Sequence, residues 1–377
     1  MPIVSRRDFL KGLAVSAGLA VSGHENVFGS SQTPELRFLV VGDSLIWGQG
    51  LHEKDKFYTL TADWLRKEAF GRDRRVDLKV KAHSGSTLKF HDDAAVKLKK
   101  AGRAETTDYH PEVNVGFPST WKQIETAARE YRSSGTSGAH LIMLSGGITD
   151  ISVSKVLDPF GDNKELPPLI ERYCRDDMID VLDHSVRQHP DASIVVLGYY
   201  PMISETSSKQ RVFNGWLESM NFPGGLKPIA NNPLTRKLFF GRIRKKGIAR
   251  SRIWVEHSNK NFQLAIDRFN SRFPSPRAVF VKSPITEDNG YETPNTLLFR
   301  MGKNGIPDDP IALSRSAECN KALPELKKST GIEYPVRLCE IAGVGHPDPQ
   351  GSRAYFDEIR NVLANHPSLI RRLAAAR

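Results

Sequence analysis

The chain has 377 residues, of which 39% are hydrophobic, 26% charged and 8% aromatic. This composition excludes collagen, a coiled coil and wholesale disorder, and it provides enough apolar side chains for a sizeable core. Three cysteines are too few for a disulfide scaffold or a four-thiolate zinc site, and no apolar run is long enough for a membrane span. The formal net charge is +11, and we expect most of the excess to be local.

The amino terminus has the pattern of an export signal. Arg6 and Arg7 are followed by Phe9 and Lys11, and then by a short, weakly apolar stretch rich in Ala, Gly and Ser. Paired arginines just before a short hydrophobic region are typical of twin-arginine signals. We therefore predict a twin-arginine signal peptide over residues 1–30, the twin-arginine translocase as a partner during export, and a periplasmic or secreted protein. An ordinary amphipathic first helix is the alternative.

The remaining residues alternate between strand and helix patterns. Apolar, β-branched runs predict strands at residues 36–41, 76–80, 140–144, 193–197 and 278–281. Apolar periodicity predicts helices at residues 58–70, 120–132, 169–188, 262–273 and 352–364. Continuous apolar strands separated by helices are typical of a parallel sheet that is covered on both faces. We predict one three-layer α/β/α domain of flavodoxin-like type over residues 31–377, with a mainly parallel sheet of about five strands.

Two segments interrupt this alternation. Residues 92–118 are polar and loop-like, and residues 204–252 form a strongly basic stretch that we interpret as an insertion or flap. Basic and large apolar residues are interleaved over residues 236–252, a pattern suited to anionic surfaces, although a solvated flap is the plain alternative. We expect a lid that favours anionic or interfacial substrates, and no motif indicates nucleic acid as a partner. The cations expected to face the substrate are Arg242, Arg244, Lys245 and Lys246.

Four short motifs lie where active groups gather in such folds, at the carboxyl ends of strands and before the last helix. A Ser directly after a buried strand exposes its hydroxyl at that edge, and a bare Gly offers its backbone N–H to an incoming oxygen. Asp43 and Asp150 are expected to brace these loops through hydrogen bonds. In chain order the motifs are Gly42-Asp43-Ser44-Leu45, His83-Ser84-Gly85-Ser86, Gly147-Ile148-Thr149-Asp150 and His346-Pro347.

In this order the motifs resemble those of the SGNH (GDSL-type) esterases and lipases, and the resemblance covers nearly the whole chain after the signal. It implies an SGNH-hydrolase fold, with Ser44 as the nucleophile and His346 as the general base. It also implies the backbone N–H groups of Ser44 and Gly85 as oxyanion donors. Thr149 stands where the family usually has Asn, and Gly343 stands where it usually has Asp.

The chemistry of a serine nucleophile agrees with these roles. His346 is the best base because an imidazole titrates close to working pH. The Thr149 hydroxyl is the candidate third oxyanion donor, and the loss of a donor or of an orienting acid slows catalysis. In a Ser–His dyad, a backbone carbonyl near Gly343 orients the imidazole. Asp348 is the weaker substitute for the acid, since it lies on the far side of the histidine.

We therefore predict hydrolysis of a carboxylic ester through an acyl-Ser44 intermediate, with His346 acting as base and then as acid. The substrate is expected to be a small-molecule, lipid or glycan ester. One alternative is a catalytically weak or inactive module that binds a glycan or lipid, which Thr149 and Gly343 favour. The other is an acyltransferase or deacetylase that acts on carbohydrate.

The cysteines allow one more inference. Cys319 and Cys339 lie close in sequence just before the His346 loop, and in an oxidising compartment we expect them to form a disulfide. Cys174 lies in a helical pattern and is expected to be a buried free thiol. No cluster of His, Cys or Asp has the spacing of a metal site, so neither a metal nor a cofactor is predicted.

Overall fold

The computed structural model describes residues 35–71, 73–105, 109–209 and 233–376, without the side chains of Asp92 and of residues 233–240. Contacts divide the chain into residues 1–33 and residues 34–377, and everything described below belongs to the second unit. The predicted signal peptide therefore lies outside the described residues, as do residues 210–232 of the predicted basic insertion.

A parallel five-stranded sheet is the centre of the described structure. All neighbouring strand pairs are parallel, and the spatial order β2-β1-β3-β4-β5 is that of a flavodoxin-like fold. The predicted fold class and the five predicted strands are thereby confirmed. The strands are β1 (Glu35–Val41), β2 (Arg75–Val80), β3 (Leu141–Leu144), β4 (Ser193–Leu197) and β5 (Ala278–Val281).

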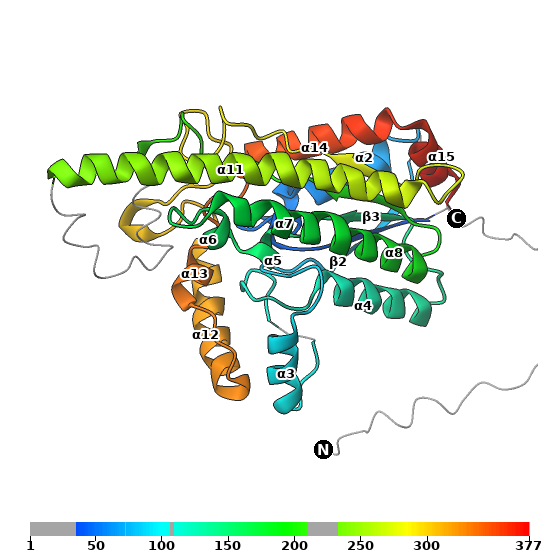
Figure 1. The fold of residues 1–377 in the computed structure, drawn as a ribbon. Helices are drawn as coiled ribbons and strands as arrows, with labels where there is room; N and C mark the ends of the chain where they lie inside the picture. The colour runs from blue at the N-terminus through cyan, green and yellow to red at the C-terminus, as the bar shows by residue number, and fades with distance from the viewer. Residues whose placement is uncertain (1–34, 72, 106–108, 210–232, 377) are drawn as a thin grey trace, which may run out of the picture. The chain divides into compact units, whose positions relative to one another are not determined.

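Helices cover both faces of the sheet and complete the three layers (Figure 1). The helices that lead from β2 to β3, from β3 to β4 and from β4 to β5 share one face, as right-handed crossovers in one direction require. On this face lie α4 (Thr120–Ser133), the continuous run of α7 (Leu166–Glu171), η3 (Arg172–Asp177) and α8 (Met178–Gln188), and α11 (Pro233–Asn270). The opposite face carries α2 (Phe57–Lys67), α14 (Pro349–Ala364) and α15 (Pro367–Ala375).

The helix before β5 is much longer than predicted. The sequence predicted residues 262–273, whereas α11 runs from Pro233 to Asn270 and includes the basic residues before position 252. Apolar periodicity did not predict the first half of α11, because a charged side chain lies at a core position there. Arg250 is fully buried and donates to three backbone carbonyls between Lys155 and Asp162. A buried guanidinium with three acceptors avoids the penalty of an unpaired charge.

A second apolar cluster lies beside the main core. It joins α3 (Asp92–Lys100) and the residues that follow it to α12 (Ala312–Thr330) and α13 (Val336–Glu340). The predicted loop over residues 92–118 therefore contains a helix and contributes to a core, because its packing partners lie far along the chain. The buried side chains of this cluster include Leu98, Val113, Val115, Phe117, Leu323 and Leu326.

Candidate active site

The strand register brings the predicted motifs together. Val41, the last residue of β1, pairs with Leu144, the last residue of β3, so the turns that follow them lie side by side. A Cβ on Gly42 would stand 2.2 Å from the Ser145 carbonyl oxygen, and φ at Gly42 is +129°. Only glycine fits this close approach of two backbones. The motifs after β1 and β3 thus share one edge of the sheet.

Ser44 and His346 meet at this edge, although they are 302 residues apart in the chain. Ser44 is the first residue of α1 (Ser44–Trp47), directly after β1, and His346 lies in the loop before α14. The distance from Ser44 Oγ to His346 Nε2 is 2.8 Å, which is hydrogen-bond distance, and the tautomer with its proton on Nδ1 would accept from the hydroxyl. This is the contact that an activated serine nucleophile makes with its base.

Asp43 braces the turn that presents Ser44. Its buried carboxylate accepts hydrogen bonds from the Leu45 N–H at 3.1 Å and the Ser145 hydroxyl at 2.6 Å, and also from the Tyr199 hydroxyl. Burial raises the pKa of this carboxyl, and the hydrogen bonds that it accepts oppose the rise. The bracing role predicted for Asp43 is confirmed by these contacts.

Two backbone N–H groups near the nucleophile are free to bind an oxyanion. Within the described part of the chain, the N–H groups of Ser44 and Gly85 have no hydrogen-bond acceptor. Gly85 has φ +81°, and a Cβ there would stand 2.2 Å from Asn114 Oδ1 and 2.6 Å from the Val115 carbonyl oxygen. Both backbone strain and lack of space therefore exclude a side chain at Gly85. The donor role of these two groups stays a prediction.

Thr149 and Asp150 tie α5 (Ile148–Ile151) to the loop after β2. The Thr149 hydroxyl donates to the Ser86 carbonyl at 2.5 Å, so its proton is already engaged. The Asp150 carboxylate accepts from the Leu88 N–H at 3.1 Å, and burial raises the pKa of Asp150 to about 7. Asp150 braces its loop as predicted. The oxyanion role of Thr149 stays a prediction and requires its hydroxyl to rotate.

His346 is partly buried, and no carboxylate of the described residues bonds to its imidazole. Burial, followed by the positive charge of Arg315, lowers the pKa of His346 to about 4, while the backbone of residues 342–344 opposes the shift. The Nδ1 atom is buried and makes no hydrogen bond with a described residue. Asp348 caps α14 instead, because its carboxylate accepts from two N–H groups of that helix. A Ser44–His346 dyad, in which a backbone carbonyl near Gly343 orients the imidazole, stays a prediction.

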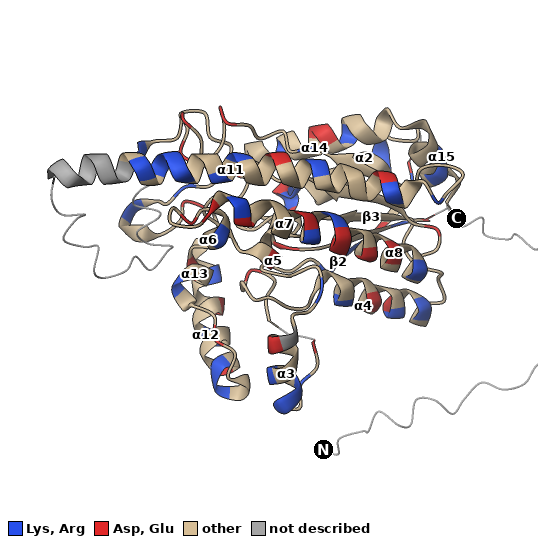
Figure 2. Cartoon of the chain, viewed as in Figure 1, with Lys and Arg blue, Asp and Glu red and all other residues tan. Residues whose placement is uncertain are grey.

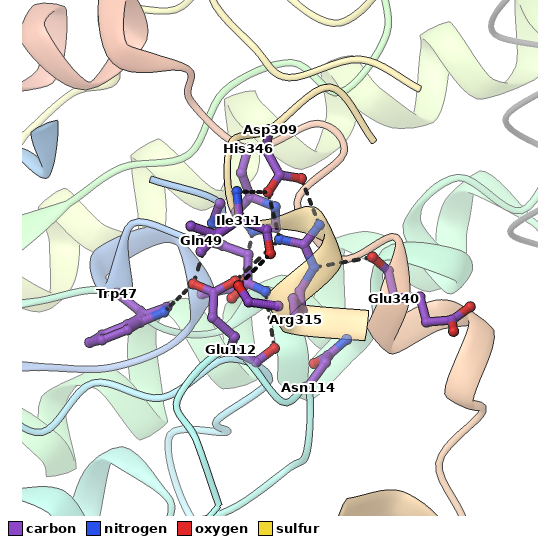
Figure 3. A network of polar contacts seen from close by, with 12 residues as sticks. Trp47, Gln49, Glu112, Asn114, Asp309, Ile311, Arg315, Glu340 and His346 are labelled. Atoms are coloured by element: carbon purple, nitrogen blue, oxygen red, sulfur yellow. Dashed lines mark hydrogen bonds and ion pairs between the residues drawn. The ribbon is translucent and has the colours of Figure 1, made fainter. Parts of the chain in front are cut away.

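A buried ionic network beside His346 was not predicted from the sequence (Figure 3). Arg315 is its centre, and the guanidinium donates to the two oxygens of Asp309 at 2.9 and 2.6 Å and to Glu112 at 3.2 Å. Trp47 Nε1 donates to the other oxygen of Glu112 at 2.6 Å, which joins the network to α1. These residues form no motif, since they lie far apart in the chain. A charged residue in the buried stripe of α12 is the signal that could have revealed Arg315.

Basic residues of the predicted flap lie along the first half of α11 (Figure 2). Some of their side chains make structural contacts, and others are exposed. Arg244 forms an ion pair with Glu205 at 2.9 Å and Arg252 forms one with Glu287 at 2.6 Å. Within the described residues, no hydrogen bond or ion pair connects this part of α11 to Ser44. Of the cations expected to face the substrate, Arg242, Lys245 and Lys246 form no ion pair with any described residue.

All three cysteines lie within the described residues. Cys319 and Cys339 form a disulfide that joins α12 to α13, just before the His346 loop. Cys174 is a buried free thiol, as predicted, and burial raises its pKa well above the ordinary value. Among the described residues, no group of three or more His, Cys, Asp or Glu side chains is placed to hold a metal ion. No helix in this part of the chain is both long and apolar enough to cross a membrane.

No protein-family model matches the sequence, and no curated protein is significantly similar to it. Among solved structures, the chain is similar to an extracellular lipase from Streptomyces rimosus, with 13% identity over 86% of this chain and 99% of the lipase and a TM-score of 0.43. It is also similar to a phospholipase A1 from Streptomyces albidoflavus, with 12% identity over 87% of this chain and 99% of that one and a TM-score of 0.40. A family two carbohydrate esterase from Clostridium thermocellum is 12% identical over 90% of this chain and 66% of the esterase, with a TM-score of 0.38. Likeness of this degree decides neither activity nor substrate, which depend on the site itself.

Proposed function

We propose that the chain is an SGNH-type hydrolase that cleaves a carboxylic ester through an acyl-Ser44 intermediate. The observation that carries the proposal is the 2.8 Å contact between Ser44 Oγ and His346 Nε2 at the carboxyl edge of the sheet. The free N–H groups of Ser44 and Gly85 support it further. A nucleophile, its base and oxyanion donors are the groups that acyl transfer requires.

The first half of the reaction transfers the acyl group to Ser44. His346 Nε2 takes the Oγ proton as Oγ attacks the ester carbonyl, and the N–H groups of Ser44 and Gly85 bind the oxyanion. When the tetrahedral intermediate collapses, the imidazolium gives this proton to the leaving alkoxide. A water molecule then attacks the acyl-enzyme with His346 again as base, which releases the carboxylic acid and restores Ser44.

The burial of His346 has two opposite effects on this reaction. A pKa of about 4 keeps the imidazole neutral, and therefore available as a base, at any pH above that value. The same burial disfavours the imidazolium that must form when His346 takes the proton. The surroundings of the imidazole therefore decide how fast the acyl-enzyme forms.

The substrate class in this proposal is a lipid or glycan ester, with anionic or interfacial substrates favoured by Arg242, Lys245 and Lys246. These cations have no ion-pair partner among the described residues, which leaves their charge available to a ligand. Replacing all three with Gln should lower the rate on an ester in anionic phospholipid vesicles, and leave hydrolysis of soluble p-nitrophenyl acetate unchanged. Equal rates on the vesicles before and after the replacement, at low salt, would remove this part of the proposal.

Export by the twin-arginine route is part of the same proposal, and its support is the Arg6-Arg7 pair before a short apolar stretch. In a bacterial host that has this route, replacing both arginines with Lys should keep the protein in the cytoplasm. The unchanged chain should reach the periplasm or the medium. Equal export of both forms would show that another signal carries the protein.

Reactivity of Ser44 is the direct test of the hydrolase proposal. The purified protein is treated with a fluorophosphonate probe, and the adduct is located by mass spectrometry in the wild type and in the Ser44→Ala, His346→Ala and Ser154→Ala variants. An adduct on Ser44 that depends on His346 and not on exposed Ser154 is the expected result. Folded wild-type protein without an adduct would overturn the proposal and favour a module that binds a glycan or lipid.

A further inference from the structure

Gly343 stands where the family resemblance places an acid, and the space for the side chain of that acid is already occupied. A Cβ on Gly343 would stand 2.3 Å from Asp309 Oδ2 and 2.9 Å from Arg315 Nη2. Within an aspartate itself, standard bond lengths put the carboxylate oxygens roughly 2.4 Å from Cβ. The Oδ2 atom of Asp309 therefore lies about as far from the Cβ position of residue 343 as the carboxylate oxygens of an aspartate at that position would lie.

Asp309 and Arg315 form a fully buried pair. Their side chains are 0% exposed, and they meet through two hydrogen bonds of 2.9 and 2.6 Å. The other charged groups around them are Glu112, which accepts from the guanidinium at 3.2 Å, and Lys56, whose charge acts on Glu112. Arg315 by itself opposes protonation of His346. The carboxylate of Asp309 offsets that positive charge at the shortest distance in the network.

The same pair holds the chain that carries His346. Arg315 Nε donates to the Glu340 carbonyl at 3.1 Å, at the end of α13. Asp309 lies against Gly343, and the Gly343 carbonyl accepts the His346 N–H at 3.1 Å. A single turn of backbone therefore separates the Asp309 carboxylate from the histidine. A change at Asp309 alters both the charge near the imidazole and the position of the loop that presents it.

We propose that Asp309 is the positioning carboxylate of His346, supplied by the segment before α12 in place of an acid at position 343. It offsets the charge of Arg315, so that the imidazolium can form, and it holds the turn at Gly343 so that Nε2 faces Ser44. The effect on reaction rate rests on the proposed ester hydrolysis. The effect on the imidazole does not require any activity.

Four variants of the full chain separate this role from a merely structural one. Asp309→Asn removes the charge with little change of shape, and Asp308→Asn makes the same change at the exposed neighbouring acid as a matched control. Gly343→Asp places two carboxylates in one space. The double variant Asp309→Ala/Gly343→Asp moves the carboxylate to position 343 and leaves Arg315 a partner.

Two readouts are measured on each variant. One is the hydrolysis of p-nitrophenyl acetate. The other is the tautomer of His346 at neutral pH, from nitrogen-15 NMR of histidine-labelled protein, with His346→Gln for assignment. We expect Asp309→Asn to lower kcat roughly 10²–10³-fold, less than the ~10⁴ lost with a directly bonded acid, with little change in KM. The fraction of His346 with its proton on Nδ1 should fall in the same variant.

The double variant should regain most of the lost kcat and the wild-type tautomer. Gly343→Asp alone should regain neither. Asp308→Asn should have the kcat and the tautomer of the wild type. The proposal is overturned if Asp309→Asn keeps both kcat and the tautomer, or if the double variant is no better than either single change. Wild-type protein whose Ser44 takes no fluorophosphonate would overturn the hydrolase proposal alone. The tautomer of His346 would then still decide the role of Asp309.

Discussion

Tyr199, two residues after β4, donates its hydroxyl to the Asp43 carboxylate, at the end of β1. Ser145, directly after β3, donates to the other oxygen of the same carboxylate. The turn that presents Ser44 is therefore held from the ends of two further strands. Its geometry depends on the strand order of the sheet as much as on the local sequence.

The Tyr199 contact should contribute measurably to stability. Tyr199→Phe leaves a buried oxygen of Asp43 without its donor, and a group of this kind costs about 1–3 kcal/mol of unfolding free energy. Urea unfolding followed by circular dichroism measures the change. Tyr173→Phe is the matched control, because the Tyr173 hydroxyl makes no hydrogen bond within the described residues. Equal stability of both variants would contradict the prediction.

Gly85→Ala should abolish most of the activity. The new Cβ would meet Asn114 and Val115 at less than van der Waals distance, so the loop must shift and carry the Gly85 N–H away from the oxyanion. The loss of one oxyanion donor corresponds to roughly 10²–10³-fold in kcat. Gly135→Ala is the control, since φ there is +78° and nothing lies within 4 Å of its Cβ. A rate for Gly85→Ala similar to that of the control would exclude Gly85 as a donor.

The acid limb of the pH–rate profile should lie near pH 4. Only neutral His346 can take the Ser44 proton, and burial lowers its pKa to about 4, so kcat/KM should rise through that pH and stay level above it. An unperturbed histidine would place the midpoint near pH 6.5. Asp150, with a pKa raised to about 7, also titrates in the neutral range. A midpoint between pH 6 and 7 that persists in Asp150→Asn would contradict the prediction.

Thr149→Asn should raise kcat. The Thr149 hydroxyl donates to the Ser86 carbonyl, whereas an amide at this position provides two N–H donors and can retain one for the oxyanion. An increase of roughly tenfold is expected, below the full value of a well-placed donor. Thr149→Val tests the present hydroxyl, and a loss of 10²-fold or more in that variant would show that Thr149 already acts as a donor. Steady-state kinetics on a soluble ester measure both.

The disulfide should stabilise the part of the chain that leads to His346. Cys319 and Cys339 are separated by 20 residues, and closing a loop of that length contributes about 3 kcal/mol to the free energy of unfolding. A reductant should therefore lower the urea midpoint of the wild type. It should have no effect on Cys319→Ala/Cys339→Ala. An unchanged wild-type midpoint, with reduction verified by alkylation, would contradict the prediction.

The five strands and their parallel order were predictable because buried parallel strands are short, continuous apolar runs, and each run is bounded by turn residues. The sequence also predicted that Ser44, Gly85 and His346 would gather, since their motifs follow strands or precede the last helix. The ends of α4, a helix with a clear apolar stripe, were predicted to within one residue. These features depend on neighbours close in the chain, or on rules that hold for any parallel sheet.

Other features depended on contacts between distant residues, and local patterns do not record such contacts. The first half of α11 was missed because Arg250 takes a core position and satisfies its charge with carbonyls from another segment. The helix in residues 92–118 was missed because its apolar partners lie in α12. In the sequence, Asp309 and Arg315 looked like ordinary surface charges. Only the fold brings them against Gly343, where the Asp309 carboxylate occupies the space that a side chain at position 343 would need.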